Sequence, residues 1–480
     1  MGEQRARNGA AIAQSLRDII REEDPTRYTT VGSDQAGPND AFTGVVDIIG
    51  LNYQGGDPRN RYVSAYELYA VSWGASPEKV FAAQDRYPYV AGEFVWTGWD
   101  YLGEPTPYDL SRSSYFGIID LAGFPKDRFY LYQSRWNPTV KMAHILPHWN
   151  WPDRKGQVTP VHVFSSGDQA ELFLNGVSQG VQKKTVSSGS YRFRWGKVVY
   201  QPGELQVVTY KNGNSWTNAT MRTTGEPSGL HASTYRDRKT IKADGADLSF
   251  ISIAVVDQKG DVVRPSNNAI TFSVQGPGEI VTTDNGDPTD MVPFPSPERK
   301  AFGGLALAIV RPKAGSSGKI TVTASAKGLE SAAVVEKPFP GVSRALVIAG
   351  SDKRGTIYGI HTLAEQSGQS PLHWFADVPA KKHAQIHAQP KTTIHGEPSV
   401  RYRGLFINDE EPALNTWWAR QHNATRYPLD TEFYAHVFDL LLRLKANYMW
   451  PAMWKSFIAP PGNVFFKDDP GNQQLADDYG

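Results

Sequence analysis

The sequence has 480 residues, which is too many for one hydrophobic core, so we expect roughly three to five domains. Its 50 basic and 49 acidic residues nearly cancel, which argues against nucleic acid or an anionic membrane as the main partner. There is no cysteine, so disulfides are excluded, and no apolar run approaches the roughly 20 residues of a membrane span.

Signals for location and for bound groups are weak. The N-terminal MGEQRARNGA has no apolar stretch of the kind found in signal peptides, whereas two sequons, Asn218-Ala-Thr220 and Asn423-Ala-Thr425, weakly suggest secretion. Single histidines such as His144 and His148 are scattered, so we expect no metal and no cofactor. Nothing in the sequence indicates an oligomeric state.

The first 138 residues alternate between predicted helices and strands. In order, we expect an amphipathic helix over 9–22, strands over 27–31 and 45–53, a broken helix over 62–72, a strand leading to residue 93, a last strand over 116–119 and a last helix around 129–132. Such alternation indicates an α/β unit with a parallel sheet. The length is about half of the roughly 250 residues that a (β/α)8 barrel needs, so we interpret 1–138 as the C-terminal half of such a barrel.

A carboxylate among aromatic rings follows one of these strands. In AGEFVWTGWDYLGEPTPY, Glu93 comes directly after the apolar run 89–91, and Trp96 and Trp99 follow it. A sugar-cleaving site needs an acid at the anomeric carbon and flat rings for the apolar C–H faces of the sugar. A lone Glu would more simply cap a turn or form a surface ion pair. The rings and the second Glu in the same loop favour a site.

This stretch resembles the nucleophile segment of the family 2 glycoside hydrolases, the β-galactosidase type. The resemblance implies that Glu93 is the catalytic nucleophile and that Tyr53 orients it through a hydrogen bond. Asn52 and Tyr53 end a predicted strand, as Glu93 does, so we expect all three at one rim of the barrel. A core tyrosine would explain Tyr53 equally well. Trp96 and Trp99 are candidate sugar platforms, one of which we expect to be core.

A retaining glycosidase also needs an acid/base, a second carboxyl group about 5 Å from the nucleophile. By the resemblance this is the Glu of an Asn-Glu pair at the end of the fourth barrel strand, just before a helix. The chain opens already entering that helix, so we expect the pair to be absent. Glu3 is a poor substitute, because an acid in a first helical turn favours the helix dipole. We therefore expect no hydrolysis of nitrophenyl β-galactoside.

Residues 139–225 and 229–336 are predicted to form two immunoglobulin-like β-sandwiches. Predicted strands over 158–164, 170–174 and 203–210 in the first, and over 248–256, 270–274 and 320–324 in the second, are separated by turn residues such as Asn175-Gly176 and Asn212-Gly213. VHVFSSGDQAELFLNGVSQG resembles the sandwich that follows the barrel in the same branch of family 2. Neither sandwich has a catalytic constellation, and support of the barrel is the simpler interpretation over glycan binding.

The pattern changes again after residue 337. We interpret 341–395 as a small α/β domain, with a strand over 345–349 and a helix over 354–365, and 396–480 as the start of a second (β/α)8 barrel. In the latter, a strand ends in the carboxylates of FINDEEP, a helix covers 431–445, and an aromatic strand covers 447–454.

The segments RGTIYGIHTLAEQSG, WFADVP, RYRGLFINDEEPAL and LKANYMWPAMW resemble the family 115 glycoside hydrolases, the xylan α-1,2-glucuronidases. The resemblance implies that Asp409 and Glu410 face the glycone pocket and that Trp450 lines it. The catalytic acid of that family lies further along its barrel than the chain extends. Capping of the next helix is an alternative role for the acids.

The sequence therefore predicts a multidomain α/β plus all-β protein, the back of one glycosidase joined to the front of another. We expect a β-galactosidase-type hydrolase acting on an oligosaccharide or plant polysaccharide, with no nucleic acid and no membrane as partner. Two alternatives stay open: a non-catalytic carbohydrate-binding protein, and a gene model that joins two neighbouring hydrolase genes. Galactose follows from the first resemblance and glucuronate from the second.

Overall fold

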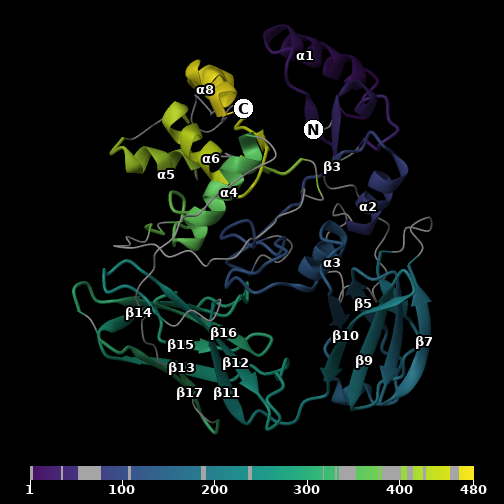
Figure 1. Cartoon of the computed structure of the whole chain (residues 1–480), viewed down its shortest axis with the longest axis vertical. Coiled ribbons are helices and arrows are strands. Elements are labelled where there is room, and N and C mark those ends of the chain that lie inside the picture. The colour runs from purple at the N-terminus through teal and green to yellow at the C-terminus, as the bar shows by residue number, and fades with distance from the viewer. Residues whose placement is uncertain are drawn as a thin grey trace. The chain divides into compact units, whose positions relative to one another are not determined.

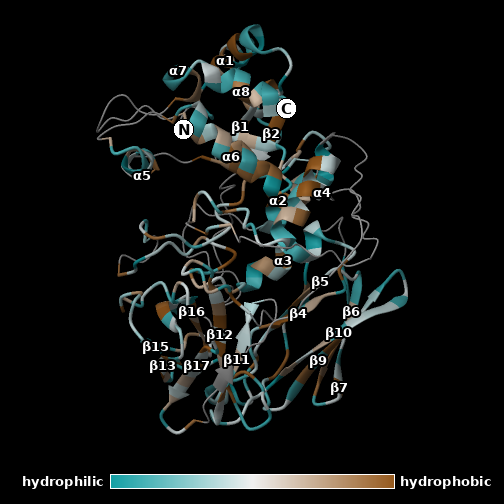
Figure 2. Ribbon diagram, turned by 60° about the vertical axis from the view of Figure 1, so that its left-hand side comes forward, coloured by the Kyte–Doolittle hydropathy of each residue, from teal (hydrophilic) through white to brown (hydrophobic). Residues whose placement is uncertain are grey.

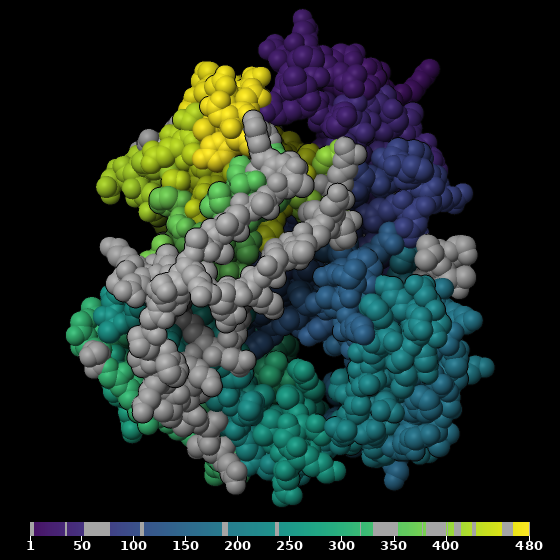
Figure 3. Space-filling model, viewed as in Figure 1, coloured from purple at the N-terminus to yellow at the C-terminus, as the bar shows by residue number. Residues whose placement is uncertain are grey.

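The computed structural model describes most of the chain, and the residues outside its described ranges are grey in Figure 3. The described residues are 4–33, 36–51, 77–105, 110–184, 191–235, 240–316, 318–329, 332–334, 353–376, 378–380, 400, 402–407, 414–424, 429–453 and 464–479. The chain divides into two compact units, Met1–Lys337 and Pro338–Gly480.

The first unit begins with a parallel α/β layer (Figure 1). Its sheet has the order β1-β2-β3, and both strand pairs are parallel. The strands are β1 (Thr30–Ser33), β2 (Ile48–Leu51) and β3 (Gly92–Glu93), and the helices are α1 (Gly9–Glu23), α2 (Pro77–Arg86) and α3 (Asp127–Trp136). A parallel sheet with interleaved helices is the α/β unit that the sequence predicts. Its membership of an eight-stranded barrel stays a prediction.

Several predicted strands in this layer differ from those observed. The strand expected over 45–53 begins only at Ile48, and the apolar run 89–91 lies before β3 and forms no strand. The expected strand over 27–31 begins only at Thr30. The prediction of a strand over 116–119 is wrong, because this segment pairs with the loop after Glu93 and forms only isolated bridges, such as Ile119 with Trp99. A Cβ on Gly117 would stand 2.0 Å from the backbone nitrogen of Asp100, so the loop approaches too closely for a regular strand. The helix predicted over 62–72 lies outside the described residues.

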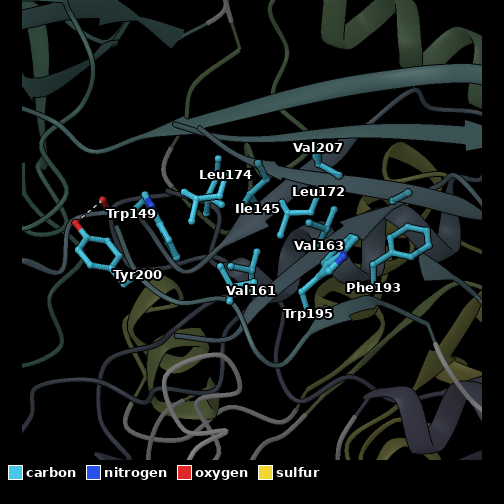
Figure 4. Close-up of a cluster of buried hydrophobic side chains, with 13 residues drawn as sticks. Ile145, Trp149, Val161, Val163, Leu172, Leu174, Phe193, Trp195, Tyr200 and Val207 are labelled. Atoms are coloured by element: carbon cyan, nitrogen blue, oxygen red, sulfur yellow. Dashed lines mark hydrogen bonds between the residues drawn. The ribbon is translucent and has the colours of Figure 1, made fainter. Parts of the chain in front are cut away.

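The first sandwich consists of two antiparallel sheets with a shared core. One sheet has the order β4-β5-β8 and the other β10-β9-β6-β7. The strands are β4 (Ala143–Leu146), β5 (Val161–Ser165), β6 (Gln169–Leu174), β7 (Val177–Lys183), β8 (Phe193–Trp195), β9 (Glu204–Lys211) and β10 (Asn214–Arg222). Figure 4 shows Val163 and Trp195 of one sheet facing Leu172 and Val207 of the other, and all four are almost fully buried. The predicted hairpin turn is confirmed at Asn175, whose φ of 51° is typical of such turns.

The second sandwich repeats this architecture. Its sheets have the orders β11-β12-β16-β14 and β15-β13-β17-β18. The strands are β11 (Gly229–Thr234), β12 (Ser249–Val256), β13 (Ala269–Gln275), β14 (Gly278–Asp284), β15 (Glu298–Lys300), β16 (Leu305–Pro312), β17 (Thr321–Ala326) and β18 (Ala332–Val334). Along β12 every second residue is buried: Ser249 and the three apolar residues Ile251, Ile253 and Val255, so the period-2 pattern selects the core face.

The second unit is mainly helical. It contains α4 (Lys353–Gln366), α5 (Leu414–Gln421), α6 (Thr431–Arg443), α7 (Phe465–Asp468), α8 (Gly471–Tyr479) and two parallel strands, β19 (Gly404–Phe406) and β20 (Tyr448–Trp450). Helix α6 is amphipathic, with Phe433, Val437 and Leu441 buried at four-residue spacing (Figure 2). No helix in the described ranges has the length and apolar character needed to cross a membrane. The strand predicted over 345–349 lies outside the described residues.

Candidate active site

Glu93 stands at the carboxyl end of the parallel sheet. It is the last residue of β3, and its register partner is Leu51, the last residue of β2. Strand β3 can approach closely because Gly50 has no side chain. A Cβ there would meet the Phe94 ring at 2.2 Å. Asn52 and Tyr53, which follow Leu51 and which the sequence places at the same rim, lie outside the described residues.

The Glu93 carboxyl is withdrawn from solvent, although the residue as a whole is half-buried. Its Oε1 accepts a hydrogen bond from the Tyr132 hydroxyl at 2.9 Å. Its Oε2 is buried and has no hydrogen-bond partner among the described residues. Burial disfavours the charged form and raises the pKa of Glu93 to about 8, and the Tyr132 hydrogen bond opposes this increase. The carboxyl is therefore mostly protonated at pH 7.

Tyr132 is held in place by packing. It lies on α3 and is 2% exposed. Its ring packs edge-on against Phe81, with centroids 5.6 Å apart, and at a tilt against Trp136, with centroids 4.6 Å apart. Burial and the Glu93 charge raise the pKa of Tyr132 well above its ordinary value, so the phenol keeps its proton and acts as a donor. Sequence reasoning missed this residue. The aromatic run over 129–132 predicts a helix, and no local signal pairs it with an acid 39 positions earlier.

The loop after Glu93 is anchored by a buried ion pair. Asp100 accepts hydrogen bonds from the Gly117 backbone N–H at 2.8 Å and from Lys126 Nζ at 2.7 Å, and its side chain is fully buried. Burial raises the pKa of Asp100, while the Lys126 charge lowers it. Both hydrogen bonds end on Oδ1, and Oδ2 lies 2.6 Å from Lys126 Nζ without the geometry of a hydrogen bond, so the ion pair and the Gly117 amide together position the loop.

The two candidate sugar platforms have different environments. Trp96 is half-buried, and its Nε1 donates to the Tyr101 hydroxyl at 3.1 Å, which in turn donates to Glu104. Trp99 is 55% exposed. Trp99 is therefore the indole that offers a large exposed surface. Trp96 is part of a hydrogen-bond relay within the loop.

The same loop is attached to the second sandwich. The Arg112 backbone N–H donates to Pro288 O at 2.8 Å, and its guanidinium pairs with Asp284 at 2.7 Å and lies 4.8 Å from the centre of the Phe294 ring. Asp120 packs directly against Gly286, and burial raises the pKa of Asp120 to about 7. The second sandwich thereby supports the segment that follows Glu93.

In the second unit, Trp450 ends β20. It is half-buried, its ring packs against Phe406 at 5.4 Å, and its Nε1 points to the Met453 sulfur at 3.0 Å. Asp409 and Glu410, which follow β19 in the sequence, lie outside the described residues. In the described part of the chain, no group of three or more acidic or histidine side chains is arranged to hold a metal ion.

Three segments match known families. Residues 233–335 match glycoside hydrolase family 2 C-terminal domain 5, residues 395–480 match glycosyl hydrolase family 115, and residues 156–217 match a domain of unknown function, DUF4982. The chain joins segments of two glycoside hydrolase families. The family 2 match falls on the second sandwich and the family 115 match on β19, β20 and the helices around them.

Longer alignments support the family 2 assignment. A β-galactosidase of Bacteroides ovatus is 34% identical over 371 residues, covering 67% of this chain and 43% of its own length. A Formosa agariphila protein provisionally named a β-glucuronidase is 33% identical over 253 residues, covering 50% of this chain and 23% of its own. The crystal structure of a β-glycosidase from Bacteroides vulgatus superposes with a TM-score of 0.56 at 26% identity, covering 68% of this chain and 49% of that one. The chain thus spans less than half the length of these relatives.

Proposed function

We propose that the family 2 segment acts on a β-galactoside and that Glu93 is the nucleophile of a retaining mechanism. The observation that carries the proposal is a buried carboxyl at the end of a parallel strand, held by a phenol donor, in a chain 34% identical to a β-galactosidase. In this mechanism a Glu93 oxygen attacks the anomeric carbon, the glycosidic C–O bond breaks, and its electron pair leaves with the aglycone. Water then hydrolyses the glycosyl ester and restores the carboxylate.

The leaving oxygen needs a proton donor, which the family supplies from an Asn-Glu pair. No Asn in the 480 residues is followed by Glu. We therefore propose that the chain by itself cleaves only bonds whose aglycone leaves as a stable anion. In the family 115 segment, we propose that Trp450 together with Asp409 and Glu410 contributes to a site for a glucuronate-bearing glycan.

A non-catalytic carbohydrate-binding role is the second candidate, and one observation favours it. A carboxyl with a pKa of about 8 is a poor nucleophile near neutral pH, because only the ionised form attacks. A protonated Glu93 would still bind a sugar hydroxyl, and Trp99, in the loop that follows it, is 55% exposed.

Two aryl galactosides of different leaving-group quality test the proposal. The chain is expected to leave 4-nitrophenyl β-galactoside intact and to release dinitrophenolate slowly from 2,4-dinitrophenyl β-galactoside, because the second aglycone needs no proton. The Glu93→Gln variant is expected to lose this release, and Glu104→Gln, a carboxylate in the same loop, is expected to keep it.

The outcomes separate the alternatives. If the chain cleaves both substrates and Glu93→Gln cleaves neither, Glu93 is supported as the nucleophile. The same result would refute the claim that the chain lacks a proton donor. Dinitrophenolate release that survives Glu93→Gln would overturn the role of Glu93. Oligosaccharide binding with neither substrate cleaved at any pH would favour the non-catalytic role.

A further inference from the structure

A surface depression on the first sandwich gathers an indole and two ammonium groups. It has a volume of about 460 Å³ and lies where the β9–β10 hairpin meets the chain that enters β4. Its lining residues are Pro138, Thr139, Lys141, Lys211, Asn212, Asn214, Ser215 and Trp216. No carboxylate is among these lining residues, and the volume falls within the range of small-ligand sites.

The indole of Trp216 is held in a defined orientation. Its Nε1 donates to Ser166 Oγ at 2.8 Å, and Ser166 in turn donates to the carbonyl of Val140. Because the ring is already ordered, a ligand that stacks on it does not bear the entropy cost of ordering it. An ordered, half-buried indole is a good surface for the C–H face of a sugar ring.

Two lysines bring positive charge to this ring. Lys211 Nζ lies 4.7 Å and Lys141 Nζ lies 5.3 Å from the centroid of Trp216. Lys211 also donates to the carbonyl of Pro138, whereas Lys141 makes no hydrogen bond or ion pair with any described residue. Asp168, beside the hairpin, accepts the backbone N–H of Asn212 at 2.7 Å. The two ammonium groups therefore lie near the same indole ring, and no carboxylate among the lining residues neutralises them.

A third lysine extends the positive field. Lys184 Nζ donates to the carbonyl of Ser165, next to the serine that holds Trp216. Burial, together with the charge of Lys211, lowers the pKa of Lys184 to about 8, against the opposing charge of Asp168. An anion placed between Lys141 and Lys211 would relieve their mutual repulsion.

We propose that this depression binds an acidic saccharide, a sugar whose apolar face rests on Trp216 and whose carboxylate or sulfate pairs with Lys141 and Lys211. The side-chain amides of Asn212 and Asn214 supply partners for ring hydroxyls. The site uses no residue of the Glu93 region, so it goes beyond the proposed hydrolysis and stands or falls independently of it.

Calorimetric titration of the full chain carrying Glu93→Gln tests the site without turnover. The probes are trigalacturonate, galactotriose, a 6-sulfated galactotriose and sodium sulfate. Trigalacturonate or the sulfated sugar is expected to bind at least tenfold more tightly than galactotriose, and the stronger of the two identifies the anionic group. Trp216→Ala and Lys141→Ala are each expected to weaken that binding at least fivefold. Lys197→Ala, an exposed lysine on the same sandwich, is expected to leave it unchanged.

Three results would overturn the proposal. If galactotriose binds as tightly as the acidic sugars, charge plays no role in binding. If inorganic sulfate binds as tightly as the acidic sugars, the site holds an adventitious ion only. Equal binding by Lys141→Ala and Lys197→Ala would place the ligand elsewhere. Because Lys141 is exposed and makes no structural hydrogen bond with a described residue, this variant remains decisive if Trp216→Ala does not fold.

Discussion

At the scale of single residues, Glu93 illustrates what a local pattern can and cannot predict. The apolar run 89–91, from which a strand was predicted, forms no strand. Glu93 does end a strand, as predicted, but that strand comprises only Gly92–Glu93 and begins after the run. Its hydrogen-bond partner, Tyr132, is brought in by the packing of α3 and has no local signature. Its pKa depends on the same packing, because burial is the main cause of the increase.

The raised pKa of Glu93 predicts a pH-dependent stability. Between the ordinary value of 4.5 and about 8, the folded chain keeps a proton that the unfolded chain has lost, so the stability that Glu93 contributes falls as pH rises through this window. Glu93→Gln cannot ionise and should escape this loss. The melting temperature of the variant relative to wild type is expected to increase from pH 5 to pH 9. A difference that stays constant would contradict the buried carboxyl.

Removal of the Tyr132 hydroxyl should destabilise the protein without disturbing the aromatic packing around that side chain. Tyr132→Phe keeps the packing against Phe81 and Trp136 but leaves Glu93 Oε1 without its hydrogen bond, which costs about 1–3 kcal/mol of unfolding free energy. Tyr130→Phe on the same helix is the control, since the Tyr130 hydroxyl makes no hydrogen bond with a described residue. Equal urea midpoints for the two variants would refute the role given to Tyr132.

At the scale of elements, turn chemistry and period-2 alternation predicted six sandwich strands to within three residues at each end, but left others, such as β7, β10, β14 and β16, unpredicted. Strand β9 spans Glu204–Lys211, against a predicted 203–210, and β12 spans Ser249–Val256, against 248–256. The strand expected over 116–119 is wrong because this segment pairs with the loop after Glu93 through isolated bridges and not a ladder, a contact that periodicity does not encode. A strong alternating pattern thus locates a strand, but strands with more polar sequences, such as β7 and β10, are missed even when their hairpin partner is predicted.

The hairpin at Asn175 depends on a glycine far along the chain. Gly203 has a φ of +140°, and a Cβ there would stand 1.8 Å from the Asn175 Oδ1, which accepts the Glu204 backbone N–H at 2.8 Å. Gly203→Ala is expected to lower the unfolding free energy by about 1–3 kcal/mol through strain and the lost hydrogen bond. Gly196→Ala, where the added methyl meets nothing within 4 Å, is the control. Denaturant titration checks this, and similar midpoints would disprove it.

At the scale of the whole molecule, the sequence predicted a join between two hydrolase families, and the family matches confirm it. The contact between the loop after Glu93 and the second sandwich could not be predicted, because Arg112 and Asp284 lie 172 positions apart. Family resemblance supplied the nucleophile role that we propose for Glu93, and tertiary contacts such as the Arg112–Asp284 pair supply the support of its loop. Asn52, Tyr53, Asp409 and Glu410 stay predictions.

Loss of Arg112 should release the loop from the sandwich. Arg112→Met removes the buried ion pair with Asp284. Because two backbone N–H groups still donate to the Asp284 carboxylate, the loss of unfolding free energy is expected to be about 3 kcal/mol or less. Limited proteolysis is expected to cut within 98–126 faster than in wild type. Arg222→Met removes an exposed pair with Glu204 and should not change the rate. Equal cleavage in both variants would show that the contact does not hold the loop.

Trapping of the glycosyl-enzyme ester tests the central claim most directly. With 2-deoxy-2-fluoro-β-galactosyl fluoride, fluoride leaves without a proton donor and the ester accumulates. Peptide mass mapping is expected to find one adduct, on Glu93, whose rate of formation rises with pH toward about 8 as the carboxyl ionises. The Glu93→Gln variant should form none. An adduct on another residue, or no adduct at pH 9 on the folded chain, would contradict Glu93 as the nucleophile.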